Sequence, residues 1–177
     1  MKPLRAFLTG EPGCGKTTAV KNTVQLLTKR GIRVGGIVSG EIREQGVRVG
    51  FSLEDILTHA TGALAHVNQK AGPRIGKYRV NLNDIATVGV VAIERAINEA
   101  DVIVIDELGP MELNSKAFIK AVQDAIVAPK HLLGTIHKRA SHALVIEIKS
   151  NPTFQIVEVT SDNRDSIPTF VAEKILR

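Results

Sequence analysis

Short runs of apolar residues alternate along this chain with segments whose apolar positions recur three and four residues apart. The runs are typical of strands buried on both faces and lie at residues 4–9, 33–39, 102–105, 131–136 and 154–159. The segments with helical spacing lie at residues 18–30, 83–100, 115–127, 141–149 and 166–176. Strands that alternate with helices predict an α/β fold, in which helices cover both faces of a parallel sheet.

The turn between the first strand and the first helix carries a GxxxxGK[ST] motif. The candidate nucleotide-binding residues are Gly10, Glu11, Pro12, Gly13, Cys14, Gly15, Lys16, Thr17 and Thr18. The glycines allow backbone N–H groups to point at a phosphate, and the following helix presents its positive end there. We expect Lys16 to reach the β- and γ-phosphates and the Thr17 hydroxyl to reach Mg²⁺. The motif, in its required context of strand, loop and helix, predicts a nucleotide-binding protein.

Two acidic residues, Asp106 and Glu107, directly follow the apolar strand at 102–105. A carboxylate at the carboxyl end of a buried parallel strand lies at the ligand-binding edge of an open α/β sheet. We therefore expect Asp106 to hold Mg²⁺ beside Thr17, and Glu107 to polarise the water that attacks the γ-phosphate. The whole segment belongs to the candidate nucleotide site, namely Val102, Ile103, Val104, Ile105, Asp106, Glu107, Leu108 and Gly109.

Residues 40–79 depart from the alternation of strands and helices. Extended segments at 41–44 and 47–51 flank the turn pair Gln45-Gly46, which predicts a hairpin. A parallel α/β core does not require this stretch. We therefore interpret it as a β-rich insertion near the nucleotide edge of the sheet.

The composition is that of an ordinary globular protein, with 44% apolar and 23% charged residues. A length of 177 residues suits one P-loop domain that covers 1–177. No apolar run is long enough for a bilayer and no signal-peptide pattern is present, so we expect a cytoplasmic protein without a membrane partner. The single cysteine, Cys14, excludes an internal disulfide and a thiolate zinc site.

The net charge of +5 is compatible with a nucleic-acid partner, and equally with attraction of polyanionic nucleotides. Aromatic residues make up only 3% of the chain, which leaves few side chains for stacking on bases. A nucleic-acid partner is therefore compatible with the sequence but is not indicated by it. We expect a monomer.

A glutamate beside the metal-binding aspartate resembles the P-loop branch with one extra strand between the cradle strand and the acidic strand. By that resemblance, residues 131–136 form the inserted strand, and its end brings His137, Lys138 and Arg139 close to the γ-phosphate. One of these side chains could then neutralise charge there, as an arginine finger does in cis. In the alternative, the three form a basic loop that faces water.

Several strings together resemble one known family: GEPGCGKTT, RVGF at 48–51, IGKYRV at 75–80, VIDELGPMEL at 104–113 and NRD at 163–165. They resemble the small thermophile-type nucleoside-triphosphatases, related to the cancer-related nucleoside-triphosphatase of animals, over nearly the whole chain. The resemblance implies a RecA-like sheet and slow, Mg-dependent hydrolysis of nucleoside triphosphates with little base selectivity. It also implies that Lys77, Glu112 and Arg164 border the nucleotide, although Pro110 stands where the family commonly has lysine.

Together these residues predict an enzyme that hydrolyses ATP, GTP, CTP and UTP. Lys16 and Glu107 are its candidate catalytic residues, and Thr17 and Asp106 its candidate metal ligands. One alternative is a nucleotide or polynucleotide kinase whose acceptor site contains Arg74, Lys77 and Arg79. A second alternative is a nucleotide-gated module that binds RNA or protein, in which hydrolysis only times the contact.

Overall fold

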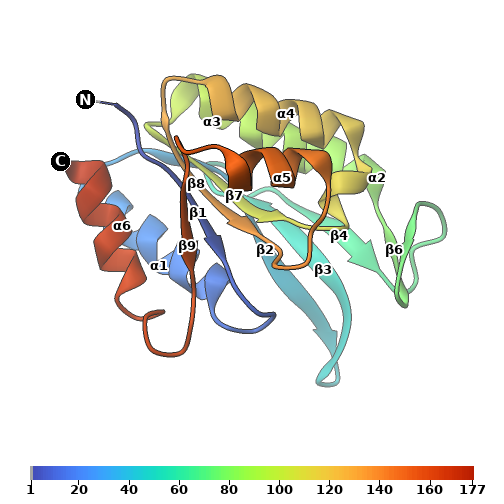
Figure 1. Cartoon of the computed structure of the whole chain (residues 1–177). Helices are drawn as coiled ribbons and strands as arrows, with labels where there is room; N and C mark the ends of the chain where they lie inside the picture. The colour runs from blue at the N-terminus through green and yellow to red at the C-terminus, as the bar shows by residue number, and fades with distance from the viewer. Residues whose placement is uncertain (1) are drawn as a thin grey trace.

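The computed structural model describes residues 2–177 and places nine strands of these residues in one sheet (Figure 1). Five strands form its parallel half, in the spatial order β2 (Val34–Glu44), β7 (Val102–Leu108), β8 (His131–Ile136), β1 (Arg5–Thr9) and β9 (Gln155–Glu158). The predicted α/β fold with a parallel sheet is confirmed.

Helices cover both faces of this parallel half (Figure 1). One face packs against α1 (Lys16–Lys29) and α6 (Ile167–Leu176), and the other against α3 (Val91–Glu99), α4 (Lys116–Val127) and α5 (Ala143–Ser150). Successive side chains of a strand point to opposite faces, so both faces of β7 are apolar. Val102 and Val104 pack with the first pair of helices, whereas Ile103 and Ile105 pack with the other three.

Strand β8 lies between the cradle strand β1 and the acidic strand β7. Leu133 pairs with Ala6 of β1 on one side and with Val104 of β7 on the other. The expected inserted strand at 131–136 is therefore confirmed.

The predicted β-rich insertion continues the same sheet with antiparallel strands. Beyond β2 come β3 (Val47–Asp55), β4 (Thr61–His66), β6 (Tyr78–Val80) and β5 (Arg74–Ile75). Gln45 and Gly46 form the turn between β2 and β3, with φ of 48° and 79°. The predicted hairpin is thus confirmed. The strand expected at 33–39 and the first hairpin strand are one continuous β2, because the pairing with β3 begins where the pairing with β7 ends.

The single helix expected over residues 83–100 is wrong in its first half. The chain forms a short turn, α2 (Leu82–Asp84), then the π-helix η1 (Ile85–Val90), and only then α3. A Cβ on Gly89 would lie 3.3 Å from the Leu53 side chain, so the backbone here lies close to β3. This packing prevails over the regular α-helical spacing. None of the helices formed by residues 2–177 is long and apolar enough to cross a membrane.

Candidate active site

The loop between β1 and α1 has the curled backbone that its motif predicts. Gly13 and Gly15 have φ of 77° and 109°, in the left-handed region that favours glycine. Lys16 begins α1, is only 8% exposed, and its Nζ donates hydrogen bonds of 3.0 and 3.3 Å to the carbonyl oxygens of Gly10 and Glu11. The ammonium is thus held against the loop whose N–H groups and helix N-terminus favour an anion.

Asp106, in the carboxyl-terminal half of β7, accepts hydrogen bonds from three different elements and is only 1% exposed. Its Oδ1 accepts from Thr135 Oγ1 at 2.7 Å and from Thr17 Oγ1 at 3.2 Å. Its Oδ2 accepts from Ser39 Oγ at 3.1 Å and from the Ser39 backbone N–H at 3.3 Å. The carboxylate therefore joins β8, α1 and β2 at one point. The peptide bond from Asp106 to Glu107 is cis.

Asp106 and Thr17 together provide oxygen donors of the kind that Mg²⁺ prefers. Mg²⁺ is usually bound by one or two carboxylates, while waters and substrate phosphates complete its coordination. No group of three or more His, Cys, Asp or Glu residues that could hold a metal occurs within residues 2–177. The fit to Mg²⁺ therefore rests on the Thr17 hydroxyl and the Asp106 carboxylate, and their donor chemistry is suitable.

The carboxyl groups of Glu107 and Glu112 approach each other around Gly109. A Cβ built on Gly109 would lie 2.9 Å from Glu112 Oε2 and 3.1 Å from Glu107 Oε1. Burial, reinforced by the charge of Glu107, raises the pKa of Glu112 to about 8. Burial and then the charge of Asp106 also raise the pKa of Glu107, while Lys16 acts in the opposite direction. Both carboxyls therefore hold a proton more strongly than an ordinary glutamate.

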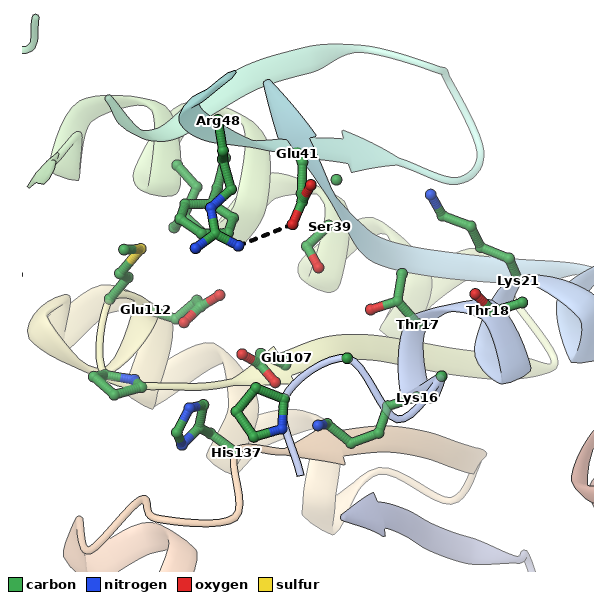
Figure 2. A pocket seen from close by; sticks show the side chains of 18 of the residues that line it. Lys16, Thr17, Thr18, Lys21, Ser39, Glu41, Arg48, Glu107, Glu112 and His137 are labelled. Carbon is green, nitrogen blue, oxygen red and sulfur yellow. Dashed lines mark hydrogen bonds and ion pairs between the residues drawn. The ribbon is translucent and has the colours of Figure 1, made fainter. Parts of the chain in front are cut away.

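The cradle, Glu107 and Glu112 line one cavity of about 570 Å³ at the carboxyl ends of the strands (Figure 2). This volume lies within the range of small-molecule sites, roughly 300–1,000 Å³. Predicted residues in its walls are Pro12, Gly13, Gly15, Lys16, Thr17, Thr18, Glu107, Glu112 and His137. Residues that the sequence did not single out as site residues are Lys21, Ser39, Gly40, Glu41, Arg48, Phe51, Leu64, Ile75, Pro110 and Met111.

Other candidate residues lie outside these walls. The side chains of Val102, Ile103, Val104, Ile105 and Leu108 are fully buried in the core, so they position Asp106 and do not face the cavity. Arg164 lies beside the cradle and does not line the cavity, and its Cδ would be 3.3 Å from a Cβ on Gly15. Lys77 places its ammonium 5.4 Å from the centre of the Tyr78 ring and does not line the cavity.

The basic loop after β8 contributes one side chain to the cavity, His137. Burial, and then the charges of Lys16 and Arg139, lower the pKa of His137, which favours the neutral imidazole at neutral pH. Lys138 instead pairs with Glu11 at 2.8 Å and with Glu158 at 3.3 Å. The structure therefore brings His137 to the cavity, whereas Lys138 is engaged by carboxylates outside its walls.

Ser39 and Thr135 are two hydrogen-bond donors to Asp106 that sequence reasoning missed. Both lie near the carboxyl ends of predicted strands, at 33–39 and 131–136. The rule that ligands bind at this edge of a parallel sheet, applied to each strand in turn, would have found them.

Comparison with known proteins agrees with this geometry. The family model described as NTPase matches residues 5–172. The nucleoside-triphosphatase THEP1 of Thermofilum pendens is 48% identical over 96% of this chain and 93% of its own length. Its counterpart from Methanosarcina acetivorans is 41% identical over 98% of each chain.

Solved structures show the same relationship. The crystal structure of THEP1 from Aquifex aeolicus matches with a TM-score of 0.86 and 31% identity, over 98% of this chain and all of the other. The solution structure of a human cancer-related nucleoside triphosphatase matches with a TM-score of 0.81 and 32% identity, over 97% of both chains. With the P-loop fold, the matching family model and these relatives, the chain belongs to the NTPase family that includes the THEP1 nucleoside-triphosphatases.

Proposed function

We propose that this chain hydrolyses nucleoside triphosphates to nucleoside diphosphates and phosphate, with Mg²⁺ as its cofactor. The observation that carries the proposal is the convergence of Lys16, Thr17 and Glu107 on one cavity, next to the buried Asp106. The names of the relatives, which are nucleoside-triphosphatases, support the same reaction.

In this proposal the cradle binds the phosphates through its backbone N–H groups and the Lys16 ammonium. Thr17 and Asp106 would hold the Mg²⁺ ion, which would supply positive charge to the phosphates during the reaction. Ser39 and Thr135 keep the Asp106 carboxylate in place through their hydrogen bonds.

Glu107 orients the attacking water and accepts its proton while the bond from the γ-phosphorus to the bridging oxygen breaks. Its raised pKa supports this role, because a stronger base is a better proton acceptor as long as it is still ionised at the working pH. Little covalent chemistry is needed from the protein, so positioning and charge compensation provide most of the acceleration.

We further propose that ATP, GTP, CTP and UTP are hydrolysed at similar rates. The cradle recognises phosphates, which all four substrates share, and the sequence carries no string such as the guanine-reading NKxD. We also propose that residues 1–177 act as one P-loop domain, as a monomer, in the cytoplasm. The free Cys14 is compatible with a reducing compartment.

A phosphate-release assay with each of the four triphosphates tests these proposals. It is run with Mg²⁺, with EDTA, and with Mg²⁺ plus RNA, and Lys16→Ala protein serves as the blank. We expect release from all four within about tenfold of one another, complete loss in EDTA, and no effect of RNA. Hydrolysis of one nucleotide alone would contradict low base selectivity, and full activity in EDTA would contradict the metal role. Severalfold stimulation by RNA would favour the nucleotide-gated module instead.

A further inference from the structure

The cavity extends beyond the phosphate site. Figure 2 shows Glu107 between the cradle, represented by Lys16 and Thr17, and a second wall that carries Glu112, with Arg48 above. In the proposed hydrolase the Lys16 ammonium contacts the β- and γ-phosphates, so the γ-phosphate lies on the Glu107 side of the cradle. The loop N–H groups hold the α- and β-phosphates, so the nucleoside follows on the side of α1 and away from Glu107. The walls beyond Glu107 are therefore left for another molecule.

A planar platform stands on this second side. The guanidinium carbon of Arg48 lies 4.9 Å from the centre of the Phe51 ring. Arg48 Nε donates to Tyr78 Oη at 3.1 Å and Nη1 donates to Glu41 Oε1 at 2.9 Å, which fixes the guanidinium plane. Phe51 is itself held edge-on by Tyr78, with ring centres 5.2 Å apart. A preorganised arginine of this kind stacks on flat aromatic ligands.

The walls around the platform are apolar. Phe51, Ile75 and Met111 are half-buried: each packs against the core on one side and lines the cavity on the other. Leu64 lines the same part of the cavity. Apolar walls with a few fixed polar groups are typical of sites for small aromatic ligands.

The charges on this side do not suit an anion. Its walls hold three carboxyl groups, Glu41, Glu107 and Glu112, and a single cation, Arg48. Arg48 is already paired with Glu41, and hydrogen bonds from Arg48 and then Arg43 lower the pKa of Glu41. Because Arg48 is already paired with Glu41, a phosphate group placed here would find no unpaired cation among these walls. The arrangement favours an uncharged ligand.

We propose that this second part of the cavity binds an uncharged nucleoside whose ring stacks on the Arg48–Phe51 platform and whose hydroxyl lies beside Glu107. The hydroxyl oxygen then attacks the γ-phosphorus in place of water, and its proton passes to Glu107. The bond from the γ-phosphorus to the bridging oxygen breaks, and the nucleoside diphosphate leaves with that oxygen. The products are a nucleoside monophosphate and a nucleoside diphosphate. The inference rests on the nucleotide position of the proposed hydrolase.

This placement moves the acceptor site away from the residues that the kinase alternative singled out. Arg74, Lys77 and Arg79 do not line the cavity, and Arg79 Nη1 donates instead to the Gly72 carbonyl oxygen at 3.1 Å. Without those cations, a polynucleotide end or a nucleoside monophosphate finds no partner for its phosphate. The expected acceptor is therefore smaller and neutral.

Transfer of label from [γ-³²P]ATP tests the proposal directly. The full-length protein with Mg²⁺ is incubated with adenosine, guanosine, cytidine or uridine in excess, and separately with their 5′-monophosphates and with 5′-hydroxyl RNA. Thin-layer chromatography separates labelled acceptor from labelled phosphate. We expect label on at least one nucleoside, and none on the monophosphates or the RNA.

Substitution of the platform provides the matched test. In Phe51→Ala the ratio of labelled nucleoside to labelled phosphate should fall at least tenfold, because the acceptor loses its stacking surface. Phe170→Ala removes a 42% exposed ring on α6 and should leave this ratio unchanged.

The outcomes separate this inference from the proposed hydrolysis. Release of phosphate without label on any nucleoside would overturn the acceptor site and leave the hydrolase in place. Label on monophosphates or RNA in preference to nucleosides would overturn the neutral acceptor. If neither free phosphate nor labelled acceptor forms, the result would contradict the proposed hydrolase itself, and the acceptor site with it.

Discussion

The hydroxyl of Thr135 donates a 2.7 Å hydrogen bond to Oδ1 of Asp106, across the boundary between β8 and β7. Both side chains are buried, with 0% and 1% exposed. Strand β8 thus does more than separate the cradle strand from the acidic strand. It provides the shortest hydrogen bond to the carboxylate that we propose as the metal ligand.

Replacement of Thr135 by Val keeps the shape of the side chain but removes this donor. A buried acceptor that loses a hydrogen bond costs about 1–3 kcal/mol, so we expect kcat to fall by roughly tenfold and the Mg²⁺ concentration for half-maximal activity to rise. Activity measured across a Mg²⁺ titration checks this. Thr135→Ser retains the hydroxyl and should stay close to the parent. A Val variant with parental Mg²⁺ dependence would show that Thr135 does not position Asp106.

Lys138 and Lys16 should differ sharply when each is replaced by Ala. Lys138 lies outside the cavity walls and pairs with Glu11 and Glu158, so we expect its loss to change kcat by less than about threefold. Loss of Lys16 removes the ammonium from the cradle, and we expect activity to fall by at least 100-fold. Steady-state phosphate release measures both. A 100-fold loss in Lys138→Ala would instead identify Lys138 as a charge-neutralising finger.

Glu112 makes the stability of the protein depend on pH. Because burial raises its pKa from 4.5 to about 8, the folded state keeps a proton that the unfolded state loses between these values. Raising the pH through this window therefore favours unfolding, by at most about 5 kcal/mol for this group. Glu112→Gln should remove that loss and raise the melting temperature at pH 8.5 relative to the parent. The exposed Glu94→Gln is the control. Equal melting curves for Glu112→Gln and the parent from pH 5 to pH 9 would contradict a buried, protonated Glu112.

The ion pair of Asp55 and Arg95 should stabilise the junction between β3 and α3. Asp55 is 2% exposed and also accepts from the Leu57 N–H at 2.9 Å and from Thr58 Oγ1 at 2.8 Å. Arg95→Leu leaves this carboxylate buried without its cation, which costs about 3 kcal/mol in the free energy of unfolding.

Urea unfolding measures that cost, and the control breaks an exposed pair. Arg33→Leu removes the partner of Glu99, where both side chains are about half exposed, and should cost less than about 1 kcal/mol. Equal losses in the two variants would show that burial of the Asp55 pair contributes nothing.

The phosphate cradle and the acidic strand were predictable because the residues of each motif are consecutive in the sequence. The glycines, Lys16 and Thr17 follow one strand, and Asp106 and Glu107 follow another, so strand and motif can be read together. The register of the parallel sheet then brings the two motifs to one edge.

The second wall of the cavity was not predictable in this way. Arg48 and Phe51 come from β3, Ile75 from β5, and Met111 from the loop after β7. They come together only through the pairing of strands and the packing of a loop, and no local sequence pattern predicts that these side chains are neighbours. The π-helix η1 is a similar case, since its packing against β3 overrides the helical spacing of residues 83–100.

The central claim is that Glu107 accepts the proton of the attacking water, and Glu107→Gln tests it most directly. Fluorescent-ATP binding and phosphate release are measured on the same preparation, with the exposed Glu173→Gln as control. The amide keeps the shape of the side chain but cannot take the proton, so we expect nucleotide affinity within about threefold of the parent and a kcat at least 100-fold lower. Hydrolysis by Glu107→Gln at the parental rate would contradict the claim.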